Sequence, residues 1–157
     1  MSKLKDEVDL LRSIPILSKL PSNKLKLLAF ASDRVSYAAG EVMFHQGDDA
    51  DAAYIIISGT GDVLVSTDAD SEPFRVASIQ EKEFVGDMAI LCDIPRTATV
   101  TAKTEIVALR ILKEHMMELI NETPALAMSV LKEQVLRLKK TTQDLTEARD
   151  ALAKLRA

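Results

Sequence analysis

The sequence of 157 residues contains no tryptophan, only two tyrosines and a single cysteine. One cysteine cannot form a disulfide within the chain, which fits a reducing compartment, so we expect a cytoplasmic protein. Cys92 itself is interpreted as a small, partly buried residue and not as a redox centre. No run approaches the roughly 18 apolar residues of a membrane span, and the N-terminus lacks the apolar core of a secretion signal.

The charge balance argues against another class of function. A net charge of −4 is unlike that of a protein whose whole surface binds DNA. With 47% hydrophobic and 28% charged residues, the composition is that of a globular chain and not of a disordered one. The length suits one domain with a real core.

The sequence lacks the motifs that are typical of catalytic and metal sites. His45 and His115 have no cysteine or acidic partners at the spacing of a metal site, so we expect no metal and no cofactor. Neither a Gly-x-Ser-x-Gly motif nor a phosphate-binding loop of the nucleotidase type is present. The sequence therefore predicts a binding protein and not an enzyme.

Glycine is confined to the middle of the chain, where all five glycines lie between residues 40 and 86. Turn residues in this part separate short β-rich runs, several of which alternate apolar and polar side chains. Seven or eight short strands at regular spacing predict a mainly β sandwich or barrel over residues 32–111. The runs cover residues 34–37, 42–45, 53–58, 63–67, 74–79, 97–102 and 106–111.

Helix-forming patterns flank this β region. Residues 1–31 predict two short helices, and residues 112–157 predict two more, the first over 112–120. The last helix is expected to start at Pro124, with Thr123 as its N-cap, and to end near residue 155. At 1.5 Å per residue it would be about 45 Å long, more than the rest of the domain needs.

This long predicted helix carries a heptad seam. Leucines recur every seven residues, and apolar residues fill the alternate position until it turns polar at Thr142 and Arg149. The pattern is typical of a parallel two-stranded coiled coil. The alternative is a helix packed on its own barrel, which explains the seam only as far as Leu138. The seam residues are Met128, Leu131, Val135, Leu138, Leu145 and Leu152.

The segment 84–100 is the strongest candidate for a binding site. Its sequence predicts a strand end, a glycine, one or two helical turns, a loop, an arginine and a new strand. At Gly86 a ligand can approach the backbone closely, and the helix amides of Met88 and Ala89 would be free donors for an anion. Arg96 adds a cationic fork that suits a phosphate.

Asp87 is the unexpected member of this segment, because a carboxylate repels a phosphate unless it accepts hydrogen bonds from another group, such as a sugar hydroxyl. An anion site, an arginine and one acceptor together indicate a ribose phosphate with a single charge. The alternative is that Gly86 only forms a turn and that Arg96 takes part in a surface ion pair of little energetic weight.

The segment resembles the phosphate-binding cassette of the cyclic nucleotide-binding domain family, roughly Phe-Gly-Glu-x-Ala-Leu-Leu-x-x-x-Pro-Arg-x-Ala. In that family the arginine and the helix amides hold the cyclic phosphate, and the acid holds the ribose 2′-hydroxyl. The resemblance implies the same roles for Arg96 and Asp87. Because aspartate replaces the usual glutamate, the reach of the acid falls by about 1.3 Å, and losing its hydrogen bond would cost about 1.5–3 kcal/mol. The matching residues are Gly86, Ala89, Leu91, Pro95, Arg96 and Ala98.

A second segment, residues 40–59, resembles the first half of the barrel of the same family. Gly40, Gly47 and Gly59 match its turn glycines. Two matching segments at the right separation imply the family's β-roll, a jelly-roll or double-stranded β-helix, with N-terminal helices and a long C-terminal dimerisation helix.

The resemblance extends to the base of the ligand. From Arg96 to about Asp144 the chain aligns without a gap to a bacterial cyclic AMP-responsive dimer of the family. There, two hydroxyl residues, one from each subunit's helix, contact the adenine, which implies that Thr141 and Thr142 contact the base. A hydroxyl at the position of Thr97 can contact guanine in the family, so cyclic AMP and cyclic GMP both stay open as ligands.

The function implied is that of a homodimeric cyclic nucleotide sensor, for cyclic AMP first, which signals to a partner protein through its long helix. No residues remain after Ala157 for a DNA-reading helix-turn-helix, so we expect no direct DNA binding and no membrane partner. The rival interpretation is a structural module that keeps the fold but has lost the ligand, which Asp87 supports and Arg96 opposes. A third is that the chain is a piece of a larger regulator.

Overall fold

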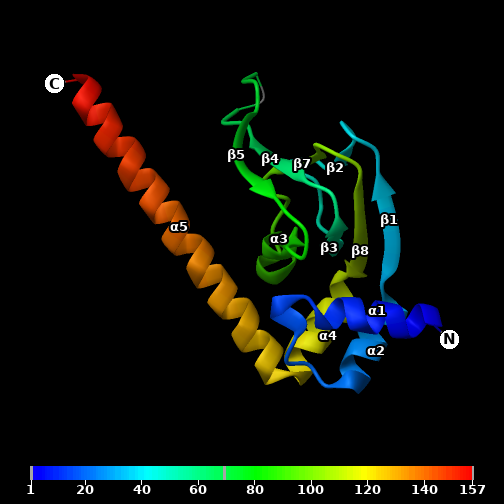
Figure 1. Cartoon of the computed structure of the whole chain (residues 1–157). Helices are drawn as coiled ribbons and strands as arrows, with labels where there is room; N and C mark the ends of the chain where they lie inside the picture. Colours follow the sequence, from blue (N-terminus) through cyan, green and yellow to red (C-terminus); the bar gives the residue numbers. More distant parts are fainter. Residues whose placement is uncertain (1, 69, 157) are drawn as a thin grey trace.

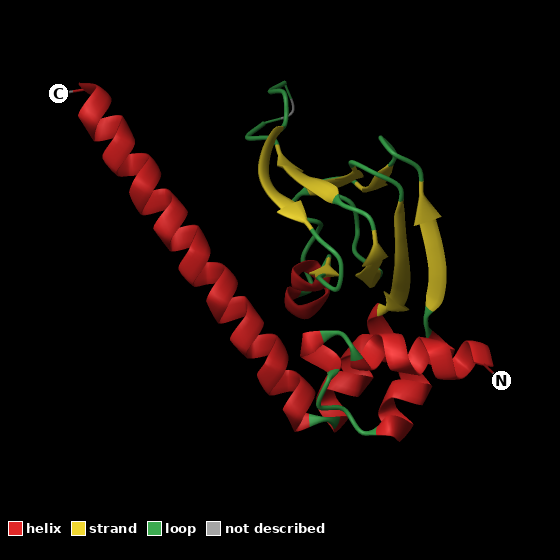
Figure 2. Cartoon of the chain, in the orientation of Figure 1, coloured by secondary structure: helices red, strands yellow, loops and turns green. Residues whose placement is uncertain are grey.

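The computed structural model describes residues 2–68 and 70–156. Its centre is a roll of two antiparallel sheets, with most of the helices gathered at one end (Figure 1). A single long helix leaves that end and diverges from the strands along the side of the roll (Figure 2). The predicted β-roll with flanking helices is therefore confirmed.

Each sheet has four strands, and all the pairings within both sheets are antiparallel. The first sheet has the strand order β1-β8-β3-β6 and the second has the order β2-β7-β4-β5. The first sheet consists of β1 (Asp33–Tyr37), β8 (Ile106–Leu112), β3 (Ala52–Ser58) and β6 (Phe84–Val85). The second consists of β2 (Val42–Phe44), β7 (Thr99–Ala102), β4 (Gly61–Val65) and β5 (Phe74–Ile79).

The first sheet is covered on both faces, and β3 shows why. Its first five residues are all buried, since side chains alternate between the two faces of a strand. Ile55 packs into a cluster with the helices, and Ile56 packs into a second cluster between the sheets. The apolar run that predicted a strand at this place is therefore the centre of the whole domain.

The helical end combines segments from both ends of the chain. Side chains from these helices, among them Leu11, Leu25 and Leu126, are fully buried against the first sheet. The helices are α1 (Ser2–Arg12), α2 (Ser22–Ala31), α4 (Lys113–Glu122), α5 (Pro124–Arg156) and the short 3₁₀ helix η1 (Pro15–Leu17). The expected helical segments are confirmed, and η1 is an addition that the sequence did not predict.

The long helix α5 fully buries an apolar side chain only near its start. Leu126 is its one buried residue, and the exposed fraction of the six seam residues ranges from 48% to 66%. The seam is therefore not packed against its own roll. Pro124 is the first helical residue, as predicted, but the Thr123 hydroxyl is buried without a hydrogen-bond partner among the described residues, so the expected side-chain N-cap is wrong. The backbone carbonyl of Thr123 instead accepts hydrogen bonds from the amides of Leu126 and Ala127.

Two further expectations need correction. The predicted strand 97–102 begins only at Thr99, because Arg96 pairs with the neighbouring loop: its amide donates to Asp48 and its carbonyl accepts from Gly47. Cys92 is exposed and not partly buried, because it ends a short helix at the surface. None of the described helices has the length and hydropathy needed to cross a bilayer.

Candidate functional site

The candidate site begins where β6 meets a short helix, α3 (Asp87–Cys92). Gly86 caps this helix with a left-handed backbone, φ 78°, which a residue with a side chain adopts only at a cost. A Cβ at Gly86 would overlap Arg96 Nη1 and would lie 3.4 Å from the ring of Phe44. The predicted succession of strand end, glycine, helix, loop, arginine and strand is confirmed, and the glycine is needed for both its conformation and its lack of a side chain.

Arg96 is a buried cation, with 4% of its surface exposed. Its Nη1 donates to the carbonyl of Gly86 at 2.8 Å and its Nη2 to the carbonyl of Ala52 at 2.6 Å. Its Nε has no hydrogen-bond partner, and it forms no ion pair with any carboxylate in the described part of the chain. Burial lowers the pKa of this guanidinium. Such a group retains one nitrogen without a hydrogen-bond partner and a charge that no ion pair compensates.

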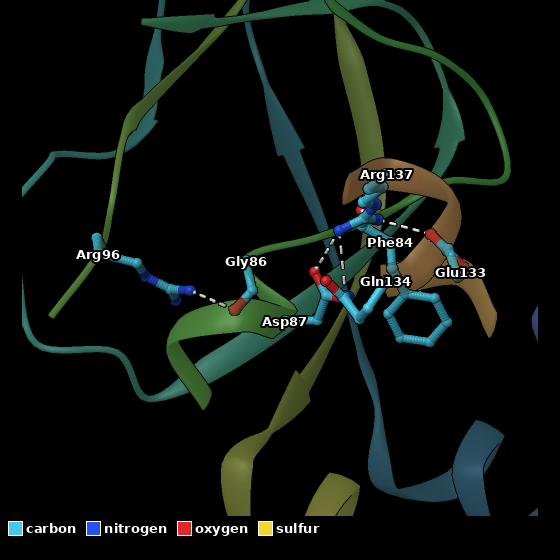
Figure 3. Close-up of polar contacts among 7 residues, drawn as sticks. All are labelled: Phe84, Gly86, Asp87, Arg96, Glu133, Gln134 and Arg137. Atoms are coloured by element: carbon cyan, nitrogen blue, oxygen red, sulfur yellow. Dashed lines mark hydrogen bonds and ion pairs between the residues drawn. The ribbon is translucent and has the colours of Figure 1, made fainter. Parts of the chain in front are cut away.

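Asp87 is also buried, with 7% exposed, but its carboxylate is well supplied with donors. Gln134 Nε2 donates to Oδ2 at 2.7 Å and Arg137 Nη1 donates to Oδ1 at 3.1 Å. Both donors come from α5, and Figure 3 shows Arg137 and Arg96 approaching the start of α3 from opposite sides. We call Asp87, Gln134 and Arg137 the Asp87 cluster.

Arg137 connects this cluster to its surroundings. Its Nη2 donates to the carbonyl of Phe84 at 3.0 Å and to Glu133 at 2.6 Å (Figure 3). Burial lowers the pKa of Arg137, but the carboxylates of Asp87 and Glu133 outweigh that effect and raise it above the usual value. The guanidinium is therefore a permanent charge that ties α5 to β6 and α3.

A cavity of about 590 Å³ lies between the roll and α5, with Arg96 and Asp87 in its wall. This volume suits a ligand of nucleotide size. All but one of the sequence-predicted binding residues line it: Gly86, Asp87, Met88, Ala89, Arg96, Thr97, Ala98 and Thr141. Thr142 is the exception; it is exposed, and it lies on the heptad seam of α5.

Several residues of the site were given no role by the sequence prediction. Gln134 and Arg137 are 47 and 50 residues from Asp87, and only the packing of α5 brings them together. A usable signal was the spacing of Glu133 and Arg137, which lie one turn apart on the face of α5 that turns away from the leucine seam. Phe44, which lies under Arg96, had no such signal. Among residues 2–68 and 70–156, no group of three potential metal ligands is found.

Comparison with known proteins places these features in a family. The family model described as "Cyclic nucleotide-binding domain" matches residues 34–123. A curated relative, the cAMP-dependent protein kinase regulatory subunit of Emericella nidulans, is 35% identical over 96 residues, which cover 61% of this chain and 22% of that protein. The chain thus spans about a quarter of the length of the curated relatives that it matches first.

Solved structures show the same fold. The sensor domain of the transcriptional regulator DNR from Pseudomonas aeruginosa superposes with a TM-score of 0.79 at 23% identity, covering 91% of this chain and 95% of that one. The regulatory domain of Toxoplasma gondii PKA, crystallised with cAMP, superposes with a TM-score of 0.76 at 20% identity, covering 85% and 50%.

Proposed function

Because the chain belongs to the cyclic nucleotide-binding domain family, we propose that it binds a cyclic nucleotide, by preference cyclic AMP, in the cavity between the roll and α5. One observation carries the proposal. Arg96 is a buried cation with a free donor and no ion pair among the described residues, and it lines a cavity of about 590 Å³. An anion that enters this cavity would supply the missing charge and acceptor.

At the anion end we assign the cyclic phosphate to Arg96 and to the amides of Met88 and Ala89. The first amides of a helix have no partner within the helix, and Gly86 leaves the approach to them open. A phosphate diester carries a single charge, which matches a single buried guanidinium. A phosphate monoester such as AMP carries more charge and lacks the cyclic phosphate ring, so it is the appropriate control ligand.

At the ribose end we assign the 2′-hydroxyl to Asp87. The hydroxyl would have to share the carboxylate with Gln134 and Arg137, which already donate to both oxygens. Ligand binding would therefore change the contacts that tie α3 to α5, and so bias the angle of the long helix. This coupling is how a small ligand could signal from the cavity to α5.

The base would lie between Thr97 and Ala98 on the roll and Thr141 on α5, all of which line the cavity. Thr142 lies on the seam and would reach a base only from a second copy of the chain. Cyclic AMP is preferred because the curated relatives are named as regulatory subunits of a cAMP-dependent kinase. Because the hydroxyl of Thr97 could contact a guanine base, cyclic GMP is the ligand to compare.

We further propose a homodimer through a parallel coiled coil of α5, acting in the cytoplasm on an effector protein. The support is the exposure of all six seam residues, from 48% to 66%, in a pattern with heptad spacing. Sedimentation at micromolar concentration should give a dimer, and Leu138→Glu should give a folded monomer. A monomeric wild-type chain at this concentration would overturn the homodimer.

A second candidate function is a module that has kept the fold and lost the ligand. It is favoured by Asp87, because both oxygens of its carboxylate already accept hydrogen bonds from side chains of the chain itself. In this case the Asp87 cluster is a structural contact and α5 is a constitutive docking helix.

Calorimetric titration of the purified chain with cyclic AMP, cyclic GMP and AMP separates the two candidates. We expect micromolar or tighter binding of a cyclic nucleotide, no comparable binding of AMP, and loss of binding in Arg96→Ala. Absence of heat and of thermal stabilisation at millimolar ligand would favour the module without a ligand.

A further inference from the structure

The wall of the cavity contains an aromatic contact that the cassette motif does not include. The guanidinium carbon of Arg96 lies over the ring of Phe44, 4.1 Å from the ring centroid. Phe44 ends β2 and lines the same cavity. At this distance a cation is attracted by the negative face of an aromatic ring, most strongly where water is excluded.

This contact supplies what the hydrogen bonds of Arg96 lack. The carbonyls of Gly86 and Ala52 fix the two terminal nitrogens within the plane of the guanidinium. Neither bond holds the flat face of the group, and no carboxylate of the described residues pairs with it. The phenyl ring covers that face, so that the plane, and with it the direction of the free Nε–H donor, is defined by three contacts.

The ring of Phe44 is itself held in place. It stacks on Tyr54 at 5.9 Å with an interplanar angle of 24°, and Tyr54 packs edge-on against Tyr37 at 6.4 Å. Tyr54 is buried in the centre of the first sheet. Gly86 permits the arrangement, because the position of a Cβ there is occupied by Arg96 and bounded by Phe44. The support for Arg96 thus extends from the surface cavity into the core.

We infer that Phe44 is a positioning residue, which holds the Arg96 guanidinium in the plane that an anionic ligand meets. The consequence for binding rests on the proposed function, whereas the Phe44–Arg96 pairing does not. An aliphatic side chain of similar size would fill the space but would not attract the cation. The inference therefore distinguishes the ring from its volume.

The pairing is tested without ligand, by a double-mutant cycle on urea unfolding with Phe44→Leu, Arg96→Met and the double variant. We expect Phe44→Leu to lower the folding equilibrium constant more when Arg96 is present than in the Arg96→Met background, by about five- to thirtyfold. Phe44→Tyr keeps the ring and should show little of this coupling loss. Equal effects of Phe44→Leu in both backgrounds would overturn the inference.

The role in binding is tested by titrating the same variants with cyclic AMP and with neutral adenosine. Phe44→Leu should weaken the affinity for cyclic AMP about five- to thirtyfold and leave the affinity for adenosine unchanged. Phe44→Tyr should bind cyclic AMP about as tightly as the wild-type chain. Equal losses for both ligands would indicate a general effect on the cavity and overturn the positioning role. If the wild-type chain binds no nucleotide, the proposed function fails, and the unfolding cycle still decides whether Phe44 holds Arg96.

Discussion

Arg96 and Asp87 are buried charges in the wall of one cavity, and they are satisfied in opposite ways. Asp87 accepts hydrogen bonds from two side chains of α5, whereas Arg96 donates only to backbone carbonyls and keeps one nitrogen without a partner among the described residues. Burying an unpaired charge such as that of Arg96 costs free energy, which a ligand of opposite charge can offset. A buried charge that is already paired, such as that of Asp87, gives no evidence of a vacant site. In the proposed complex, a ligand would therefore add a contact at the Arg96 end and would have to share one at the Asp87 end.

The largest effect is expected at the cation. Arg96→Ala should weaken cyclic nucleotide binding by about a hundredfold or more, because a charge-assisted contact to phosphate is lost from a buried site. The variant also leaves the carbonyls of Gly86 and Ala52 unpaired, so urea unfolding should be measured with calorimetry. Arg96→Lys keeps the charge without the fork and should bind with intermediate affinity. Unchanged affinity in Arg96→Ala would contradict the assignment of the phosphate to Arg96.

Gly86→Ala should have the next largest effect. Forcing a side chain into a left-handed backbone costs about 1–2 kcal/mol, and the new Cβ would displace Arg96. Gly40→Ala is the matched control, since Gly40 has φ 88° and no atom within 4 Å of the added Cβ. Both variants should lose similar stability to urea, but only Gly86→Ala should also lose about tenfold in affinity, because it moves the cation. Similar affinities in the two variants would mean that Gly86 is only a turn.

At the Asp87 end a gain of affinity is expected. Gln134→Ala removes the shortest hydrogen bond to the carboxylate, so the ribose hydroxyl would share Oδ2 only with the longer, 3.5 Å contact of Arg137 Nη1. Affinity for cyclic AMP should rise by about three- to tenfold, as measured by calorimetry. The 2′-deoxy ligand should show no rise, and Gln143→Ala, on an exposed part of α5, should have no effect. An equal rise with the 2′-deoxy ligand would contradict the role of Asp87 as the ribose acceptor.

The smallest effect concerns the pH dependence of stability. Burial raises the pKa of Glu83, which lines the same cavity, above its ordinary value of 4.5. Between the pKa of Glu83 in the unfolded chain and its raised pKa in the folded chain, the folded chain holds more protons than the unfolded chain. The free energy of unfolding therefore falls as pH rises through the folded pKa. Glu83→Gln should remove this part of the pH dependence and leave the chain at least as stable near neutral pH. Urea unfolding at several pH values checks it, and an unaltered slope in the variant would contradict it.

The extent of agreement between sequence and structure follows from the range of the interactions. The β-roll was predictable because its strands alternate and its corners require glycine, both of which are local properties. Gly86 and Arg96 were predictable because they are only ten residues apart, within one strand–helix–loop segment. The start of β7 was misplaced because Arg96 bonds to residues 47 and 48 instead of extending the strand.

The partners of Asp87 and Arg96 were not predictable, because these contacts join residues that are far apart in the sequence. Gln134 and Arg137 meet Asp87 only after α5 has packed beside the roll, and Phe44 meets Arg96 across 52 positions of sequence. Helical phase separated Thr141, which lines the cavity, from Thr142, although the two are adjacent in sequence. The motif therefore located the candidate site, and tertiary packing determined which of its two charges already has side-chain partners.

The free length of α5 has a mechanical consequence. From Arg137 to Arg156 the helix extends about 28 Å, and every described residue after Arg137 is exposed. This stretch is a rigid lever whose support includes the Asp87 cluster. A tilt of about 10° at Arg137 would move the far end by about 5 Å, given the helical rise of 1.5 Å per residue. In the proposed mechanism, the exchange of one hydrogen bond at a carboxylate would thereby become a displacement as large as a residue, at a distance from the cavity where another protein could detect it.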